Sequence, residues 1–111
     1  MALLAETSGS KSQNQKWFSS DLAPSNDGMI QIHLAIAEGA ATDEFQYTVD
    51  GGTNWVKYGV GSGGGQPSAA ANAGIVVEMP ISRTSRFNIR CTATGNRTVL
   101  FCQVHAPLLN L

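Results

Sequence analysis

The strongest pattern along the chain is an alternation of apolar with other residues, which is typical of β-strands that bury one face. Alternating stretches lie at residues 30–36, 45–49, 54–60, 75–81, 86–91 and 99–105. No stretch repeats with the roughly 3.6-residue period of an amphipathic helix. Turn residues separate the stretches, as in Pro24–Gly28. The pattern predicts an all-β protein, either an antiparallel β-sandwich or a jelly-roll-like barrel.

Two of the turns predict which stretches pair. Asp50-Gly51-Gly52 joins 45–49 to 54–60 as a hairpin, because glycine permits the positive φ that tight turns need. A turn near Asn96 and Arg97 would fold 86–91 against 99–105, with Cys91 opposite Cys102. That register keeps the apolar faces of the two stretches together.

The ends of the chain show no such period. Residues 1–18 are polar over Ser8–Lys16 and predict an extended N-terminal arm, which Trp17 and Phe18 anchor on their own domain or on a neighbour. Residues 19–111 then form a single β-sandwich domain. Within it, 59–74 is a long Gly/Ala loop that is either mobile or ordered by a partner. Leu108, Leu109 and Leu111 are expected to dock rather than face water.

Composition excludes several classes of protein. A chain of 111 residues makes one domain. No apolar run reaches the roughly 18–20 residues of a membrane helix. The formal net charge of −1 argues against binding a nucleic-acid backbone. The apolar start, Met1–Ala5, is too short for a signal peptide. Only 14% of residues are charged, against roughly 25% in average domains, which is common where neighbours cover the surface.

One local motif stands out at residues 48–55, TVDGGTNW. It resembles the Asp-box of sialidases, with Asn54 where that box usually has threonine. The resemblance implies a structural hairpin built by Thr48, Asp50, Gly52 and Trp55, and no glycosidase chemistry. The local physics agrees, because an aspartate at this position can accept hydrogen bonds from the turn's backbone.

Candidate catalytic groups are few. His33 and His105 are the only general bases for neutral pH, and both occupy strand positions opposite the apolar stripes. The chain has no nucleophile elbow, no HExxH zinc motif and no phosphate loop followed by a helix. Cys91 and Cys102 lack a CxxC spacing, so they are either buried thiols or a disulfide. We therefore expect no enzyme activity, no cofactor and no metal.

Two sets of residues leave binding functions open. Arg86 and Arg90 share one face with Asn88, which is a solvated face, an inter-subunit salt-bridge face or, least favoured, a nucleic-acid contact. Trp17, Trp55 and Tyr58 are candidates for a sugar-binding platform.

Taken together, the chain resembles small virion proteins of tailed bacteriophages. The matching features are the polar arm, the hairpin Phe45–Trp55 (FQYTVDGGTNW), the Gly/Ala loop and the strand Arg86–Cys91 (RFNIRC). The resemblance implies a head decoration or cement protein that is assembled in the host cytoplasm and binds by shape, without chemistry or cofactor. It further implies a homo-oligomer, with a trimer favoured, on the major capsid protein or another virion protein. Its interface candidates are Trp17, Phe18, Arg86, Arg90, Leu108, Leu109 and Leu111.

Three alternatives make different predictions. A collar, tail or baseplate β-protein would bind elsewhere in the virion. A carbohydrate- or receptor-binding module would present coplanar, exposed Trp or Tyr rings. An enzyme would hold His33 or His105 in a cleft beside a carboxylate.

Overall fold

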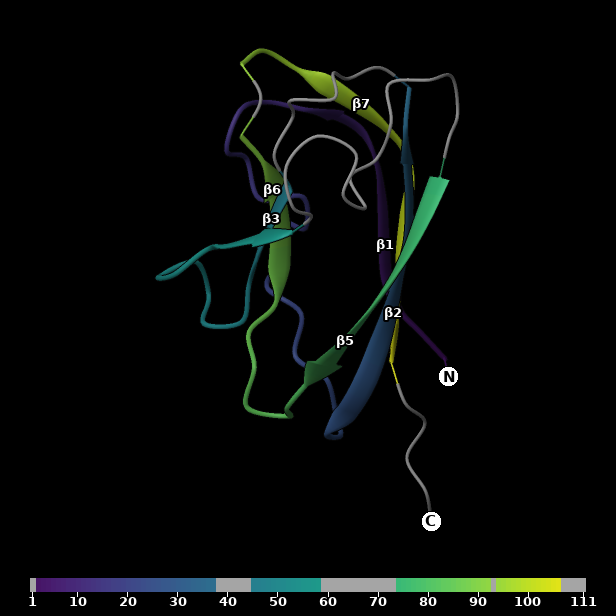
Figure 1. The fold of residues 1–111 in the computed structure, drawn as a ribbon, viewed down its shortest axis with the longest axis vertical. Helices are drawn as coiled ribbons and strands as arrows, with labels where there is room; N and C mark the ends of the chain where they lie inside the picture. The colour runs from purple at the N-terminus through teal and green to yellow at the C-terminus, as the bar shows by residue number, and fades with distance from the viewer. Residues whose placement is uncertain (1, 38–44, 59–73, 93, 107–111) are drawn as a thin grey trace.

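The computed structural model describes residues 2–37, 45–58, 74–92 and 94–106. These form two antiparallel sheets that face each other as a sandwich (Figure 1). The strands are β1 (Ala2–Lys11), β2 (Gly28–Ile36), β3 (Phe45–Thr48), β4 (Val56–Tyr58), β5 (Gly74–Ile81), β6 (Asn88–Cys91) and β7 (Arg97–Ala106). One sheet has the order β1-β7-β2-β5 and the other β4-β3-β6. The predicted all-β, antiparallel sandwich is confirmed.

The alternating stretch 30–36 lies inside the four-stranded sheet as β2. Its even-numbered residues point into the sandwich, so Ile32 pairs with Val104 and Leu34 with Cys102 of β7. Its other edge pairs with β5, for example Ile30 with Met79. Because the three-stranded sheet packs against this face, the even-numbered apolar residues of β2 are almost fully buried.

The N-terminal residues do not form the expected arm over 1–18. β1 instead pairs antiparallel with β7 as an edge strand of the four-stranded sheet, with Glu6 opposite Gln103. The register shifts between Leu3 and Ala5 and again between Thr7 and Gly9. Such bulges interrupt the two-residue period, which explains why the sequence shows no alternation there.

The segment after β1 crosses to the other sheet and runs beside β6. The backbone N–H of Trp17 donates to the carbonyl of Ile89, and Leu22 exchanges backbone hydrogen bonds with Phe87. Trp17 and Phe18 are buried, and Trp17 meets Phe45 edge to face with ring centroids 5.7 Å apart. The sequence predicted that Trp17 and Phe18 anchor the N-terminal segment either on their own domain or on a neighbour. In the structure they are anchored in the protein's own core.

The expected hairpin between 86–91 and 99–105 is absent. β6 pairs with β3 in one sheet, whereas β7 lies between β1 and β2 in the other. The connection between β6 and β7, with a positive φ of 86° at Gly95, therefore joins the two sheets. Alternation predicts which face of a strand is buried, and it does not identify the strand's partner.

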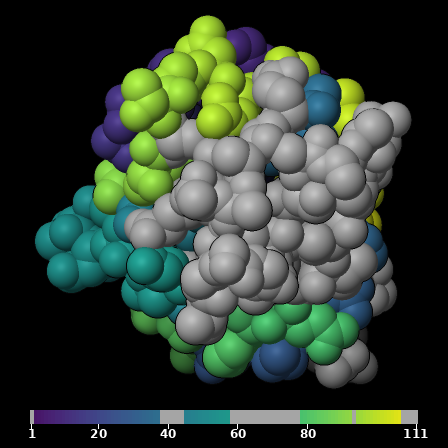
Figure 2. Space-filling view, turned by 45° about the horizontal axis from the view of Figure 1, so that its top comes forward, coloured from purple at the N-terminus to yellow at the C-terminus, as the bar shows by residue number. Residues whose placement is uncertain are grey.

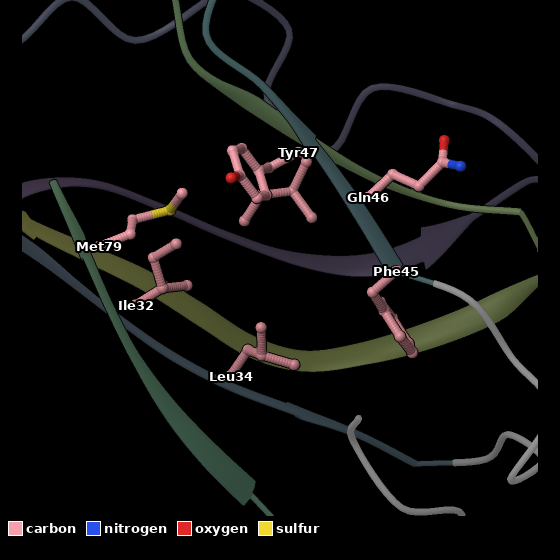
Figure 3. Close-up of a pocket in the computed structure, with 7 residues that line it drawn as sticks. Ile32, Leu34, Phe45, Gln46, Tyr47 and Met79 are labelled. Atoms are coloured by element: carbon pink, nitrogen blue, oxygen red, sulfur yellow. The ribbon is translucent and has the colours of Figure 1, made fainter. Parts of the chain in front are cut away.

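The core lies between the two sheets and contains one small cavity among the described residues. A cavity of about 20 Å³ is lined by Ile32, Leu34 and Met79 from one sheet and by Phe45 and Tyr47 from the other (Figure 3). Gln46, between the last two, points away from this apolar group. The space is comparable to one water molecule and has no polar lining, so it is a packing defect rather than a ligand site.

Some expectations lie outside the described residues. These are the loop 59–74, of which only Gly74 is described as the first residue of β5, and the terminal leucines Leu108, Leu109 and Leu111. Within the described part of the chain, no helix has the length and apolar character to cross a membrane.

Candidate functional site

The outward face of the four-stranded sheet carries a ladder of acidic, amide and imidazole side chains. Direct partners in antiparallel strands point to the same face, so the register places these side chains together. One row across the sheet is Leu3, His105, Gln31 and Glu78, and the next row contains Glu6, Gln103 and His33. We call this surface the ladder face.

Hydrogen bonds connect one half of the ladder face from β5 to β2. The Gln31 amide donates to Glu78, with 2.8 Å between Nε2 and Oε1. The same glutamine presents its Oε1 to His33 Nε2 at 3.4 Å. All three groups therefore have partners within the protein.

The other half repeats this order from β1 to β7. Gln103 donates to Glu6 at 3.3 Å and presents its Oε1 to His105 Nε2, also at 3.3 Å. The two halves meet where the imidazoles of His33 and His105 stand edge to face, with ring centroids 5.1 Å apart. The ladder face is thus a connected network across the strands.

The geometry at the two histidines differs from what the enzyme hypothesis predicted. His33 and His105 contact glutamine amides and each other, and no carboxylate of the described residues is in direct contact with either imidazole. Neither histidine lines the core cavity or the open groove described below. The described residues also contain no group of three or more His, Cys, Asp or Glu side chains arranged to hold a metal.

Apolar side chains surround the ladder on the same face. Leu3, Met29 and Phe101 are 49%, 43% and 43% exposed. Leu3 pairs with His105 and Phe101 with Ala35, which places both on the outward side of the sheet. An exposed leucine, methionine and phenylalanine on one face make it a candidate surface for contact with another protein.

On the other sheet, the predicted hairpin residues form a hydrogen-bonded turn. The Thr48 hydroxyl donates to Asp50 Oδ1 at 2.7 Å and accepts from the backbone N–H of Gly52 at 2.9 Å. Gly52 has a φ of 101°, which is strained for other residues. The loop between β3 and β4 projects from the body of the sandwich (Figures 1 and 2).

Asp50 organises the second half of this turn. Its carboxylate accepts hydrogen bonds from the Asn54 backbone at 2.9 Å and from the Asn54 side chain at 2.7 Å. These bonds, first that of the backbone, together with the Thr48 hydroxyl lower the pKa of Asp50 to about 2. The asparagine that departs from the Asp-box pattern is thus a partner of the aspartate.

Trp55 supports a cation on the outward side of the three-stranded sheet. The Arg90 guanidinium lies over the Trp55 ring, 4.2 Å from its centroid, and Arg90 Nε donates to Gln46 at 2.7 Å. Register places Lys57, Gln46 and Arg90 in one row across β4, β3 and β6. We call this surface, together with the exposed Arg86 beside the turn, the hairpin face.

A second network ties the hairpin tip to the N-terminal segment. Lys16 Nζ donates to the Gly51 carbonyl at 2.9 Å and to Asp21 Oδ1 at 3.1 Å. Asn88 Nδ2 also donates to Asp21, at 2.9 Å. The Asn88 bond, and then Lys16, lower the pKa of Asp21. The network holds the turn against the sandwich.

The predicted interface candidates therefore separate into distinct places. Trp17 and Phe18 lie in the core and are not available to a neighbour, whereas Arg86 and Arg90 remain at the surface. The polar face expected from Arg86, Asn88 and Arg90 is interrupted. Asn88 is fully buried and bonds both backbone groups of Phe18.

An open groove of about 420 Å³ lies between β1 and residues 15–22. Its two lysines already have acceptors: Lys16 bonds Asp21 and Gly51, and Lys11 donates to the Thr7 hydroxyl at 2.9 Å. The buried indole N–H of Trp17, which also lines the groove, has no hydrogen-bond partner. The positive charges of the groove are therefore met by acceptors within the protein.

Both cysteines are buried, and no disulfide joins them. Burial raises the pKa of Cys102 to about 12, which leaves it protonated at neutral pH. The sequence left open whether the two cysteines are buried thiols or form a disulfide, and in the structure they are thiols.

Sequence reasoning missed four members of the ladder face: Glu6, Gln31, Glu78 and Gln103. Gln31 was visible as a polar position in the cleanest alternating stretch, beside His33. The other three become neighbours only through the order β1-β7-β2-β5, which alternation does not contain.

No family model matches the sequence, and no curated protein matches it. Among solved structures, the chain is similar to a carbohydrate-binding module from the lichenase 5A of Cellvibrio mixtus, which was solved in complex with cellotriose. The TM-score is 0.53 at 12% identity, over 96% of this chain and 99% of that one. At this identity the similarity shows a shared fold.

Proposed function

We propose that this chain is a non-catalytic structural protein of a virion, which decorates or cements a phage capsid as a homo-oligomer, with a trimer favoured. Its partner would be the major capsid protein or another virion protein, and assembly would take place in the host cytoplasm. The protein would act by shape-complementary binding and need no cofactor.

The ladder face is the observation that carries this proposal. Leu3, Met29 and Phe101 are exposed on one side of a sheet, around side chains that already bond each other. Exposed phenylalanine and methionine, in a region without lysine, are typical of a protein interface. The assignment to a virion is supported by the resemblance of the sequence to small virion proteins of tailed bacteriophages.

Co-sedimentation with phage heads that lack this protein tests the proposal. We expect saturable binding at a fixed ratio to the capsid protein, and Phe101→Asp should weaken it roughly tenfold or more. Thr94→Asp is the matched control, because Thr94 is exposed in the connection after β6. Binding to isolated tails or collars instead would indicate that the protein belongs to that part of the virion rather than to the head. Failure to bind any virion component would contradict the proposal.

Oligosaccharide binding is the second candidate function. It is supported by the fold shared with a carbohydrate-binding module and by the amide, imidazole and carboxylate groups of the ladder face. The tryptophans count against it, because Trp17 is buried and Trp55 is covered on one side by Arg90. Coplanar exposed rings are therefore not formed by these two residues.

A glycan panel separates the two candidates. Binding of a glycan that Gln103→Ala abolishes would favour the carbohydrate function. No change in Trp fluorescence or thermal stability with any glycan would leave the virion proposal as the stronger one.

A further inference from the structure

The two outward faces of the sandwich carry opposite charges. Glu6 and Glu78 lie on the ladder face, and among its described outward positions there is no lysine or arginine. The hairpin face carries Lys57 and Arg90 in one row, with Arg86 exposed beside the turn. Among the described carboxylates near the turn, Asp21 is paired with Lys16, whereas Asp50 is hydrogen-bonded by the neutral Thr48 and Asn54 and keeps its negative charge. The three cations of the hairpin face still outnumber that one carboxylate.

The ladder-face carboxylates retain room for a cationic partner. Glu6 and Glu78 are both exposed. Glu6 accepts a side-chain hydrogen bond from Gln103, and Glu78 accepts one from Gln31. A carboxylate has about four acceptor positions, so lysine or arginine can approach without displacing the glutamine. Glu6 lies on β1 and Glu78 on β5, the two edge strands of the sheet. The two carboxylates would therefore flank a partner that covers the centre of the ladder face.

Exposed apolar groups accompany the charges on the ladder face, where Leu3, Met29 and Phe101 surround the polar side chains. On the projecting hairpin, Val49 and Val56 are 41% and 46% exposed, and Val56, which pairs with Tyr47, lies on the opposite side of β4 from Lys57. Apolar contact supplies most of the affinity in such an interface, and the charges select its orientation.

The charges disfavour packing of like faces. Two ladder faces in contact would bring four carboxylates together, and two hairpin faces would bring lysines and arginines together. A ladder face against a hairpin face instead places Glu6 and Glu78 opposite Lys57, Arg86 and Arg90. This arrangement is head-to-tail, and a head-to-tail contact makes a closed ring when its rotation closes and an open filament when it does not.

Resting on the homo-oligomer of the proposed function, we propose that the ladder face of one copy binds the hairpin face of the next. Each copy then contacts one neighbour through its ladder face and another through its hairpin face. Substitutions that disrupt either face would therefore disrupt the assembly. The partner of the ladder face is thereby a second copy of this chain.

Charge exchange between the faces tests this arrangement. Glu6→Lys with Glu78→Lys makes both faces basic, and Lys57→Glu with Arg86→Glu makes both acidic. We expect either double variant to raise the dissociation constant of self-association roughly tenfold or more, measured by sedimentation velocity. The quadruple variant has exchanged charges and an unchanged net charge, and it should return to the wild-type mass. Arg83→Glu, in the turn between β5 and β6 and on neither face, is the control.

The outcomes separate this inference from the proposed function. If the wild type is oligomeric but either double variant keeps its mass, or the quadruple variant stays dissociated, the head-to-tail contact is wrong and the homo-oligomer stands. If only the ladder-face variant dissociates, copies meet through like faces, and the inference is likewise overturned. If the wild type is a monomer, both the homo-oligomer and this inference fail. All substituted positions are exposed, and thermal melts verify that each variant is folded.

Discussion

The hydroxyl of Thr48 donates a 2.7 Å hydrogen bond to the carboxylate of Asp50 and at the same time accepts from the backbone of Gly52. Thr48 is fully buried, whereas the turn that it supports is at the surface. One side chain at the end of β3 thus determines how the projecting hairpin begins.

Removal of this hydroxyl should destabilise the protein measurably. Thr48→Ala leaves the Gly52 N–H without its acceptor and Asp50 without one donor, which costs about 1–3 kcal/mol of unfolding free energy. Thr48→Ser keeps the hydroxyl and should cost less. Urea denaturation followed by circular dichroism measures both, and equal losses would contradict the role of the hydroxyl.

Asp50 should make stability depend on pH in the acid range. Its folded-state pKa of about 2 lies below the ordinary aspartate value of 3.8, so its stabilising contribution is present above about pH 4. That contribution is lost as the pH falls toward 2, because the unfolded chain then binds the proton more readily. Asp50→Asn removes the titration, so wild type and variant should converge in stability as the pH falls from 5 to 2. A constant difference between their unfolding free energies over that range would contradict this assignment.

Trp17 is expected to matter for folding rather than for a partner. Trp17→Ala should lower the unfolding free energy by about 3–5 kcal/mol, because it empties a buried site in contact with Phe45. Trp17→Phe keeps an aromatic ring and removes an indole N–H that has no partner, so it should cost clearly less. Unchanged stability of the isolated Trp17→Ala variant would mean that Trp17 is not in the core.

The buried thiol of Cys102 should be unreactive in the folded protein. With a pKa of about 12 it holds almost no thiolate, and the thiolate is the reactive form. Ellman's reagent at pH 8 should therefore label Cys102 only after denaturant is added, which Cys91→Ala isolates as a single signal. Rapid labelling without denaturant would contradict its burial.

Much of the fold follows from local pattern. The stretch 30–36 has an apolar residue at every second position, and its buried face is the one that the pattern predicts. The Asp50-Gly51-Gly52 turn sits between β3 and β4 because both glycines adopt the positive φ that such a turn requires.

Pairing between distant strands did not follow from the pattern. β1 has register shifts on either side of Glu6, so its sequence resembles a polar tail although it pairs with β7. Cys91 and Cys102 both belong to alternating stretches, yet the chain crosses between sheets after β6. Alternation reports burial of a face, whereas partner choice depends on packing over the whole core.

The same limit applies to the candidate site. His33 and His105 were recognisable one at a time, but their contact depends on β2 and β7 being neighbours. Arg90 was recognisable as a surface cation, and its position over Trp55 depends on the fold of the hairpin.

The most direct test of the account is the mass of the full-length wild-type protein in solution. Size-exclusion chromatography with light scattering, over a range of concentrations, should give a multiple of the 11.7 kDa chain mass, with a threefold multiple favoured. Higher salt should lower that mass, since salt screens the charges on the two faces. A single species of 11.7 kDa at every concentration would contradict the account.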